Sequence, residues 1–426
     1  MKKLLSLCLL ACLPLAAQQI PAPTELSGSP FFIKNTWIIG GTGNWDYLKM
    51  DPRAHQLFIA HGAQVQVVDV ESGAVAGQIS GLREAHGIAL DESGEFGYIS
   101  DGLAGQVKVF DRRTFKVVAA IPTGPSPRAI VFEPQSRLIF VIGGAPQART
   151  PGAQNARVAR PVATRPTTST ITVIDAQTRR VLATILMPGA LGFAQTGGAG
   201  EVYVSIVDRN QIARLDGQAI AAQAIASRSQ AGTPEAEADK SGSGQAPGVQ
   251  SGGAKPVGAE VTLDWTGLPR SAQASDSRVR FLSLGPGCRE PRSLAVDSRH
   301  LRLFVACDDM KMAVLNAVTG EPVASLPTGP GTDAIGYDAG RGLIYTANGG
   351  ANGSLTIIHQ DVTDTYAVIQ NLPTRQRART LAVDSATGDV YLVTDLLGMN
   401  LAQPGSIGTL QAVPVNGSFQ VLVVGH

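Results

Sequence analysis

Residues 86–124 read HGIALDESGEFGYISDGLAGQVKVFDRRTFKVVAAIPTG, and this stretch contains four short apolar runs. The runs cover 87–90, 96–101, 106–111 and 117–121, and Asp, Ser, Thr and Gly gather between them. Such residues favour turns, and short apolar runs between turns are typical of β-strands. The stretch therefore predicts a unit of four consecutive strands.

The same unit recurs along the chain. The residue before each first strand marks the register, and successive markers are 40, 42, 64, 100, 41 and 46 residues apart. A four-stranded repeat of about 40 residues is the signature of a β-propeller blade. We therefore predict an all-β, seven-bladed β-propeller with four-stranded blades. The markers are Asp46, His86, Arg128, Gly192, Arg292, Asp333 and Arg379.

The two ends of the repeat array predict how the ring closes. The last copy has three strands, the third being 419–424, whereas an apolar run at 31–39 precedes the first copy. We expect this N-terminal strand to become the outer strand of the last blade, because pairing there removes an open sheet edge.

Residues 18–426 are thus expected to form a single propeller domain with insertions at 145–168, 217–276 and 396–416. The first insertion is rich in Arg, and the second is rich in Ala, Gly, Ser and Gln. We expect most of the second to be disordered, although 260–263 has the composition of a short strand. The simplest interpretation of all three is a tolerated surface loop.

Residues 1–17 have the pattern of a signal peptide: two lysines, a short apolar run and two alanines. We expect a periplasmic or secreted protein. A lipoprotein anchored through Cys12 is an alternative, because Leu-Leu-Ala-Cys at 9–12 resembles a lipobox. Beyond this segment the sequence has no 18-residue apolar run, so we expect no membrane-spanning helix there.

Outside the signal peptide the chain has two cysteines, Cys288 and Cys307. An even pair in an exported protein suggests one disulfide. Cys288 precedes the first strand of the fifth copy and Cys307 ends the second, and antiparallel neighbours at one sheet end lie at a suitable distance. Two free thiols are the alternative.

The starts of the first strands and the ends of the second strands must lie on the same face of a propeller. Polar residues at these positions would surround the mouth of a concave, pre-formed channel, which suits a ligand. Local loop hydrogen bonds and internal ion pairs are the alternative reading. The predicted ligand-binding residues are Asp46, His86, Asp101, Arg128, Arg292, Asp333 and Arg379.

A second hypothesis concerns Asp46, His61, His86 and Asp101, all expected on this face. Two imidazoles and two carboxylates can hold a divalent metal or serve as general acid and base. Their spacing comes from the repeat and not from a metal motif, so ordinary loop bonding is the alternative. No other cofactor is predicted, since the sequence lacks a phosphate loop, a nucleophile elbow and a haem motif.

On the opposite face, the aspartates that end third strands are explained by Asx turns: Asp69, Asp111, Asp175 and Asp216. The histidines outside the mouth, His55, His300 and His359, are expected to be solvated.

The repeats resemble the YVTN-repeat β-propellers of the YncE type. The matching segments are 43–47, 85–90, 288–291, 373–380 and 417–425. The resemblance implies an exported propeller with a binding function. It also suggests binding of single-stranded nucleic acid as one alternative. Gly192 departs from the pattern, because an acidic residue is usual near that position.

Composition argues against the nucleic-acid alternative. Lys and Arg total 35 against 34 acidic residues, and aromatic residues make up 5% of the chain. Single-stranded nucleic acid needs a basic groove with stacking aromatics, so we do not expect it as a partner. We expect a monomeric binding or scaffold protein whose small-molecule or protein partner contacts the polar mouth. A lactonase-like or metal-dependent hydrolase using the same face is the main alternative.

Overall fold

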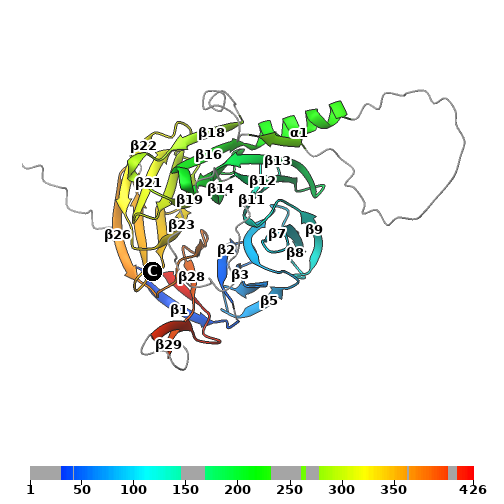
Figure 1. Ribbon diagram of the computed structural model, residues 1–426. Helices are drawn as coiled ribbons and strands as arrows, with labels where there is room; N and C mark the ends of the chain where they lie inside the picture. The colour runs from blue at the N-terminus through cyan, green and yellow to red at the C-terminus, as the bar shows by residue number, and fades with distance from the viewer. Residues whose placement is uncertain are drawn as a thin grey trace, which may run out of the picture.

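The computed structural model describes residues 30–41, 43–144, 168–231, 261–264, 278–361, 364–401 and 410–426. Seven sheets of four or five strands stand like blades around a central channel (Figure 1). The predicted seven-bladed all-β propeller is therefore confirmed.

The elements follow the predicted order along the chain. The first three blades contain β2 (Trp45–Asp51), β3 (Gln56–His61), β4 (Gln64–Asp69) and β5 (Val75–Ile79); β6 (Ala85–Leu90), β7 (Phe96–Asp101), β8 (Gln106–Asp111) and β9 (Val117–Pro122); and β10 (Pro127–Glu133), β11 (Leu138–Gly143), β12 (Thr168–Asp175) and β13 (Arg180–Pro188). The next three contain β14 (Leu191–Thr196), β15 (Glu201–Ile206), β16 (Gln211–Asp216) and β18 (Val279–Ser283); β19 (Pro291–Asp297), β20 (Arg302–Cys307), β21 (Lys311–Asn316) and β22 (Pro322–Pro327); and β23 (Thr332–Asp338), β24 (Leu343–Asn348), β25 (Ser354–Gln360) and β26 (Tyr366–Pro373). The short helices η1 (Val207–Arg209) and η2 (Gly285–Gly287) lie in loops.

The seventh blade closes the ring as predicted. It contains β27 (Leu381–Val383), β28 (Val390–Thr394), β31 (Gln420–Gly425) and β1 (Phe32–Ile38). Strand β1 pairs antiparallel with β31, so segments from both ends of the chain share one sheet. Lys34 Nζ on β1 binds Asp389 Oδ1 at 2.9 Å on the same blade. This pairing covers the outer edge of β31.

The second strand of each blade shows why the blades stack. In β3 the consecutive residues Leu57, Phe58 and Ile59 are all fully buried. A strand covered on both faces has no solvent side, so its apolar residues run without alternation. The two faces of each blade pack against the neighbouring blades. The hydrophobic core is therefore a series of apolar layers, one between each pair of adjacent blades.

The insertions contain regular structure that the sequence pattern only partly indicated. Helix α1 (Gly217–Ala231) follows β16, and Ile220 and Ala224 on it are buried against the third and fourth blades. We did not predict this helix. Strand β17 (Val261–Asp264), close to the strand composition noted at 260–263, pairs parallel with β13 and extends the third blade.

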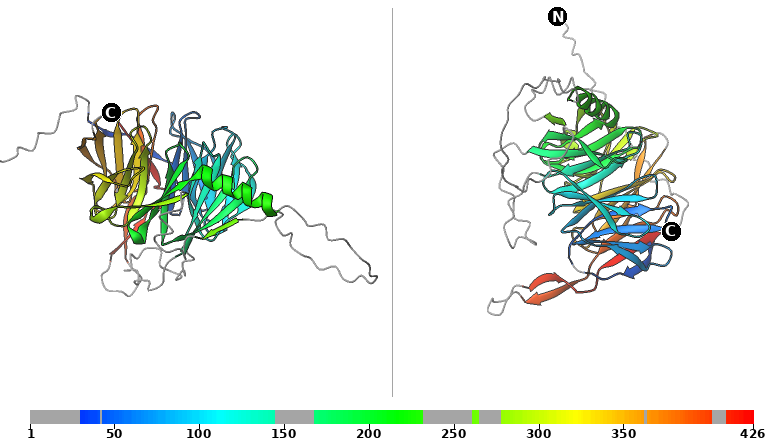
Figure 2. Two further views of the ribbon diagram at one scale, coloured as in Figure 1. Left: turned by 90° about the horizontal axis from the view of Figure 1, so that it is seen from above. Right: turned by 90° about the vertical axis from the view of Figure 1, so that its right-hand side faces the viewer.

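The third insertion forms a hairpin of β29 (Leu397–Leu401) and β30 (Leu410–Pro414). Figure 2 shows this hairpin, in red and orange, standing out from the body of the propeller. The 145–168 insertion lies outside the described residues except for Thr168. Among the helices that the structure describes, none is long and apolar enough to cross a membrane.

The disulfide prediction is confirmed. Cys288 and Cys307 are bonded, with their Cα atoms 5.3 Å apart and both side chains fully buried. Cys307 ends β20 opposite Pro291 of β19, which is the sheet-end arrangement the sequence suggested. The bond therefore ties the connection between the fourth and fifth blades to the end of β20.

The Asx turns on the opposite face are also present. Asp69, Asp111 and Asp175 each accept a hydrogen bond from the backbone N–H three residues later. Asp216 accepts one from Ala219 N at 2.9 Å and so caps the start of α1. These carboxylates shape turns and carry no functional argument.

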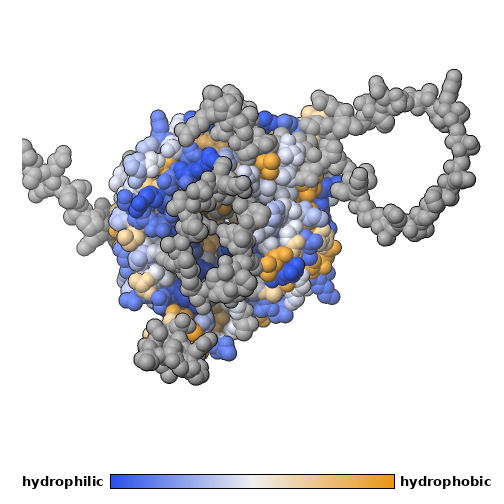
Figure 3. All heavy atoms as spheres, in the orientation of Figure 1, coloured by the Kyte–Doolittle hydropathy of each residue, from blue (hydrophilic) through white to orange (hydrophobic). Residues whose placement is uncertain are grey.

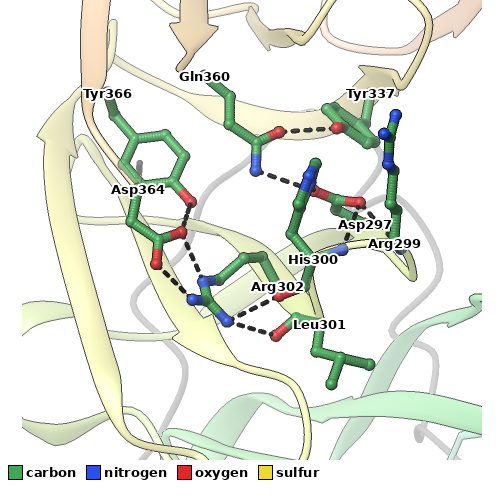
Figure 4. Close-up of polar contacts among 9 residues, drawn as sticks. All are labelled: Asp297, Arg299, His300, Leu301, Arg302, Tyr337, Gln360, Asp364 and Tyr366. Carbon is green, nitrogen blue, oxygen red and sulfur yellow. Dashed lines mark hydrogen bonds and ion pairs between the residues drawn. The ribbon is translucent and has the colours of Figure 1, made fainter. Parts of the chain in front are cut away.

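A polar network joins the fifth and sixth blades on this face (Figure 4). The buried carboxylate of Asp297 accepts hydrogen bonds from His300 Nδ1 at 2.7 Å and from Gln360 Nε2 at 2.9 Å. Tyr337 donates to Gln360 Oε1 at 2.7 Å. His300, expected to be merely solvated, is thus a partner of the buried acid. Burial alone would raise the pKa of Asp297, but the bonds from His300 and Gln360 outweigh it and lower the pKa.

This lowered pKa predicts a pH dependence. A carboxyl group whose pKa falls on folding stabilises the protein above its unfolded pKa, about 3.9, and that contribution is lost as the pH falls through the folded value. We expect Asp297→Asn to lower the free energy of unfolding by about 1.5–3 kcal/mol at neutral pH. The difference from wild type should shrink at about pH 3. Urea unfolding at the two pH values measures it, and an equal difference at both would contradict the assignment.

Candidate functional site

The channel mouth is built by a repeated irregularity of the inner strands. In β2, β6, β10, β14, β19 and β23 the pairing with the second strand shifts register at the marker residue, for example between Trp45 and Leu48 and between Ala85 and Ile88. Such bulges re-aim side chains. The marker residues of the first six blades thus occupy bulges, and their side chains need not follow the strand alternation.

The first polar group of the mouth comes from the first three blades. His86 Nδ1 lies 2.6 Å from Asp46 Oδ2, and His86 Nε2 lies 3.3 Å from Glu84 Oε2. Arg128 Nη2 approaches the same Asp46 oxygen at 3.6 Å and is 54% exposed. Both nitrogens of this buried imidazole are therefore engaged by carboxylates.

The second group comes from the sixth and seventh blades. Arg379 Nε lies 3.3 Å from Asp333 Oδ2, and its Nη2 is 3.5 Å from the carbonyl oxygen of Trp45. Enclosure by the channel wall raises the pKa of Asp333, with Arg379 opposing and Asp46 reinforcing the shift. The side chain is nevertheless 44% exposed, so water or a ligand can reach it.

The third group lies on the fifth blade. Arg292 Nη2 contacts Glu290 Oε2 at 2.7 Å and Asp308 Oδ1 at 3.2 Å. In Figure 3 hydrophilic residues, in blue, gather over this blade. All three arginines of the mouth are thus paired with acids while keeping part of each guanidinium accessible.

An aromatic pair crosses the channel below these groups. Tyr47 of the first blade stacks on Phe193 of the fourth, with ring centroids 5.4 Å apart and an interplanar angle of 25°. Burial, reinforced by the charge of Asp46, raises the pKa of Tyr47, so the phenol stays neutral. Because these blades are not neighbours in the ring, the stacked rings form a floor under the polar mouth.

Two predicted residues do not belong to this mouth group. Asp101 is fully buried and accepts hydrogen bonds from the backbone N–H groups of Arg83 and Glu84. His61 is buried as well and contacts Gln66 Oε1 at 2.8 Å and Gly43 O at 3.3 Å. Their side chains hold loops in place.

The four residues of the metal hypothesis are therefore not brought together. The structure pairs Asp46 with His86, whereas His61 is bonded to Gln66 and Asp101 to backbone N–H groups. No group of three or more His, Cys, Asp or Glu that could hold a metal ion occurs within the described part of the chain. The repeat placed all four on one face, but it could not say which hydrogen bonds each makes.

Sequence reasoning missed Glu84, Tyr47, Phe193 and Glu290. Tyr47 and Phe193 each directly follow a marker residue, so the register alone could have identified them. Their contact across the channel depends on ring closure and has no local signal.

Comparison with known proteins identifies the fold alone. No family model and no curated protein matches the chain in sequence. Solved structures do match in shape. U3-55K has a TM-score of 0.59 at 8% identity, covering 92% of this chain and 98% of its own. The WD40 repeats of RRP9 have a TM-score of 0.60 at 8% identity, covering 93% and 97%. A chain of the mitotic checkpoint complex has a TM-score of 0.58 at 10% identity, covering 90% and 96%. The chain is thus a seven-bladed β-propeller with WD40-like structural neighbours.

Proposed function

We propose that the protein is an exported binding protein of the YVTN-repeat type whose ligand or partner contacts the channel mouth. One observation carries the proposal: bulged inner strands place paired but accessible charges above a stacked aromatic floor. A few convergent polar groups beside apolar and aromatic surface are typical of a ligand site.

Export to the periplasm or beyond is supported by two features. The N-terminal segment has the signal pattern, and the buried disulfide suits an oxidising compartment. The protein acts as a monomer in this proposal, either free or lipid-anchored through Cys12.

The geometry favours binding over hydrolysis. A general base needs a free basic atom within hydrogen-bond reach of the substrate. The imidazole of His86 has Asp46 at one nitrogen and Glu84 at the other, and its side chain is 8% exposed. It is therefore better placed to hold two carboxylates in position than to accept a proton from a substrate.

A matched pair of triple variants tests the proposal. Arg128→Ala/Arg292→Ala/Arg379→Ala removes three charges from the mouth, whereas Arg113→Ala/Arg137→Ala/Arg180→Ala removes three exposed charges from the opposite face. Wild type, mouth variant and control are each equilibrated with small molecules extracted from the producing cells, and retained compounds are measured by mass spectrometry.

We expect compounds retained by wild type and by the control variant to be lost from the mouth variant, because a charged hydrogen bond contributes about 1.5–3 kcal/mol. Retention that survives in the mouth variant, or that is lost only in the control, would contradict the mouth as the ligand site.

A further inference from the structure

A pocket lies beside the mouth, at the junction of the seventh and first blades. We call the charged residues of the mouth the mouth ring: Asp46, Glu84, His86, Arg128, Glu290, Arg292, Asp308, Asp333 and Arg379. The cavity of the pocket, about 320 Å³, lies at the small end of the range for ligand pockets, roughly 300–1,000 Å³. None of the mouth-ring residues lines the pocket. The lining combines polar and apolar side chains: Asn44, His61, Arg377, Asp395, Pro414, Val415, Asn416 and Phe419.

The charges in this pocket are already matched. Arg377 Nη1 lies 2.8 Å from both carboxylate oxygens of Asp395. The guanidinium also lies over the Trp45 ring, 4.6 Å from its centroid. Because the one guanidinium and the one carboxylate cancel, the pocket gives no net attraction to an anion or a cation.

The matched pair still has unused hydrogen-bonding capacity. A single guanidinium nitrogen serves both oxygens of Asp395, although a carboxylate offers about four acceptor positions. The Asp395 side chain is 7% exposed, and this burial raises its pKa even though Arg377 opposes the shift. Among the bonds to described residues, Arg377 Nη2 makes none. Hydroxyl groups could donate to Asp395 and accept from Arg377.

Two exposed amides extend this capacity at the rim. Within the described residues, the side chains of Asn44 and Asn416 make no hydrogen bond, and each offers donors and an acceptor. His61 belongs to the wall, since both of its nitrogens are engaged and its ring packs 3.9 Å from the Phe419 centroid. Pro414, Val415 and Phe419 supply apolar surface.

We propose that this pocket binds a neutral polyhydroxylated molecule, a sugar or cyclic polyol. Such a ligand carries hydroxyls that both donate and accept, has no charge, and presents C–H faces to apolar surface. A charged ligand would instead have to compete with the Arg377–Asp395 pair. The inference concerns a site separate from the mouth ring, so each can fail alone.

The test uses glucose, maltose, myo-inositol and the anion gluconate as probes, titrated into the full chain and followed by saturation-transfer difference NMR. Asn44→Ala/Asn416→Ala should bind the preferred neutral probe about 4- to 140-fold more weakly, because each of two neutral hydrogen bonds contributes roughly 2- to 12-fold in affinity. The control Asn35→Ala/Asn371→Ala, on outer strands, should bind like wild type.

Charge matching gives a second readout. Asp395→Asn leaves Arg377 unpaired, so the preference of a folded variant should shift from the neutral probes toward gluconate. If this variant does not fold, the comparison of Asn44→Ala/Asn416→Ala with its control decides whether the pocket binds the probe. The inference is overturned if wild type binds no neutral probe, if gluconate binds wild type best, if the Asn44/Asn416 variant binds unchanged, or if folded Asp395→Asn keeps its preference.

The triple mouth variant distinguishes binding at the pocket from binding at the mouth. We expect Arg128→Ala/Arg292→Ala/Arg379→Ala to bind the neutral probe like wild type, because none of these residues lines the pocket. Loss of probe binding in that variant would assign the probe to the mouth and overturn the pocket as its site.

Discussion

Replacing Arg112 with methionine is expected to lower the free energy of unfolding by about 3–5 kcal/mol. Arg112 extends from the second blade and forms an ion pair with Asp51 of the first, and both side chains are nearly inaccessible. Its Nη1 also donates to Asp91 O at 3.1 Å. Removing the guanidinium leaves a buried carboxylate without its charge partner, which is the costly case for a buried pair.

Two further variants separate this pair from ordinary surface charge. Asp51→Asn/Arg112→Met removes both charges, so no buried carboxylate is left without its partner, and it should recover part of the loss. Lys34→Met breaks the more exposed pair with Asp389 and should cost less than about 1 kcal/mol. Denaturant unfolding measures all three. Equal small effects of Arg112→Met and Lys34→Met would contradict a buried inter-blade link.

Removing the disulfide is expected to have the second large effect. The bond closes a loop with a sequence separation of 19 residues, for which constraint of the unfolded chain gives about 3 kcal/mol. Cys288→Ala/Cys307→Ala should therefore lower the free energy of unfolding by about 2–5 kcal/mol. Because Glu290 and Arg292 follow Cys288 closely, the change should also loosen the fifth-blade group of the mouth.

The wild-type protein provides the control for this experiment. Unfolding in the presence of enough reductant to break the bond should give the stability of the double variant, and reductant should not affect the variant itself. A wild-type protein whose unfolding midpoint is unchanged by reductant, and equal to that of the variant, would contradict a stabilising disulfide.

The repeat determined what could be predicted from sequence. Blade number, closure by β1, the sheet-end disulfide and the third-strand Asx turns all follow from short local patterns that recur in register. Helix α1 is not part of the repeat and was not predicted. Its Ala- and Gln-rich sequence favours a helix, but its low charge and its neighbours suggested a disordered insertion.

The candidate site was harder to predict because its contacts depend on ring closure and on competition for hydrogen bonds. The register placed His61 and His86 on the same face, yet Gln66 holds one and Asp46 holds the other. Tyr47 meets Phe193 only because opposite blades face each other across the channel. The sequence of a single repeat predicts neither the partners of the two histidines nor the contact between the two rings.

The central claim is that the mouth face is the binding face, and photo-cross-linking in the producing cells tests it most directly. Benzoylphenylalanine would replace exposed apolar residues in matched pairs: Leu103 and Met310 in loops of the mouth face, and Val117 and Leu301 on the opposite face. Intact mass after irradiation reports small-molecule and protein adducts alike. We expect adducts from the mouth positions and none from the opposite pair. Adducts from the opposite pair alone, or from no position, would contradict the account.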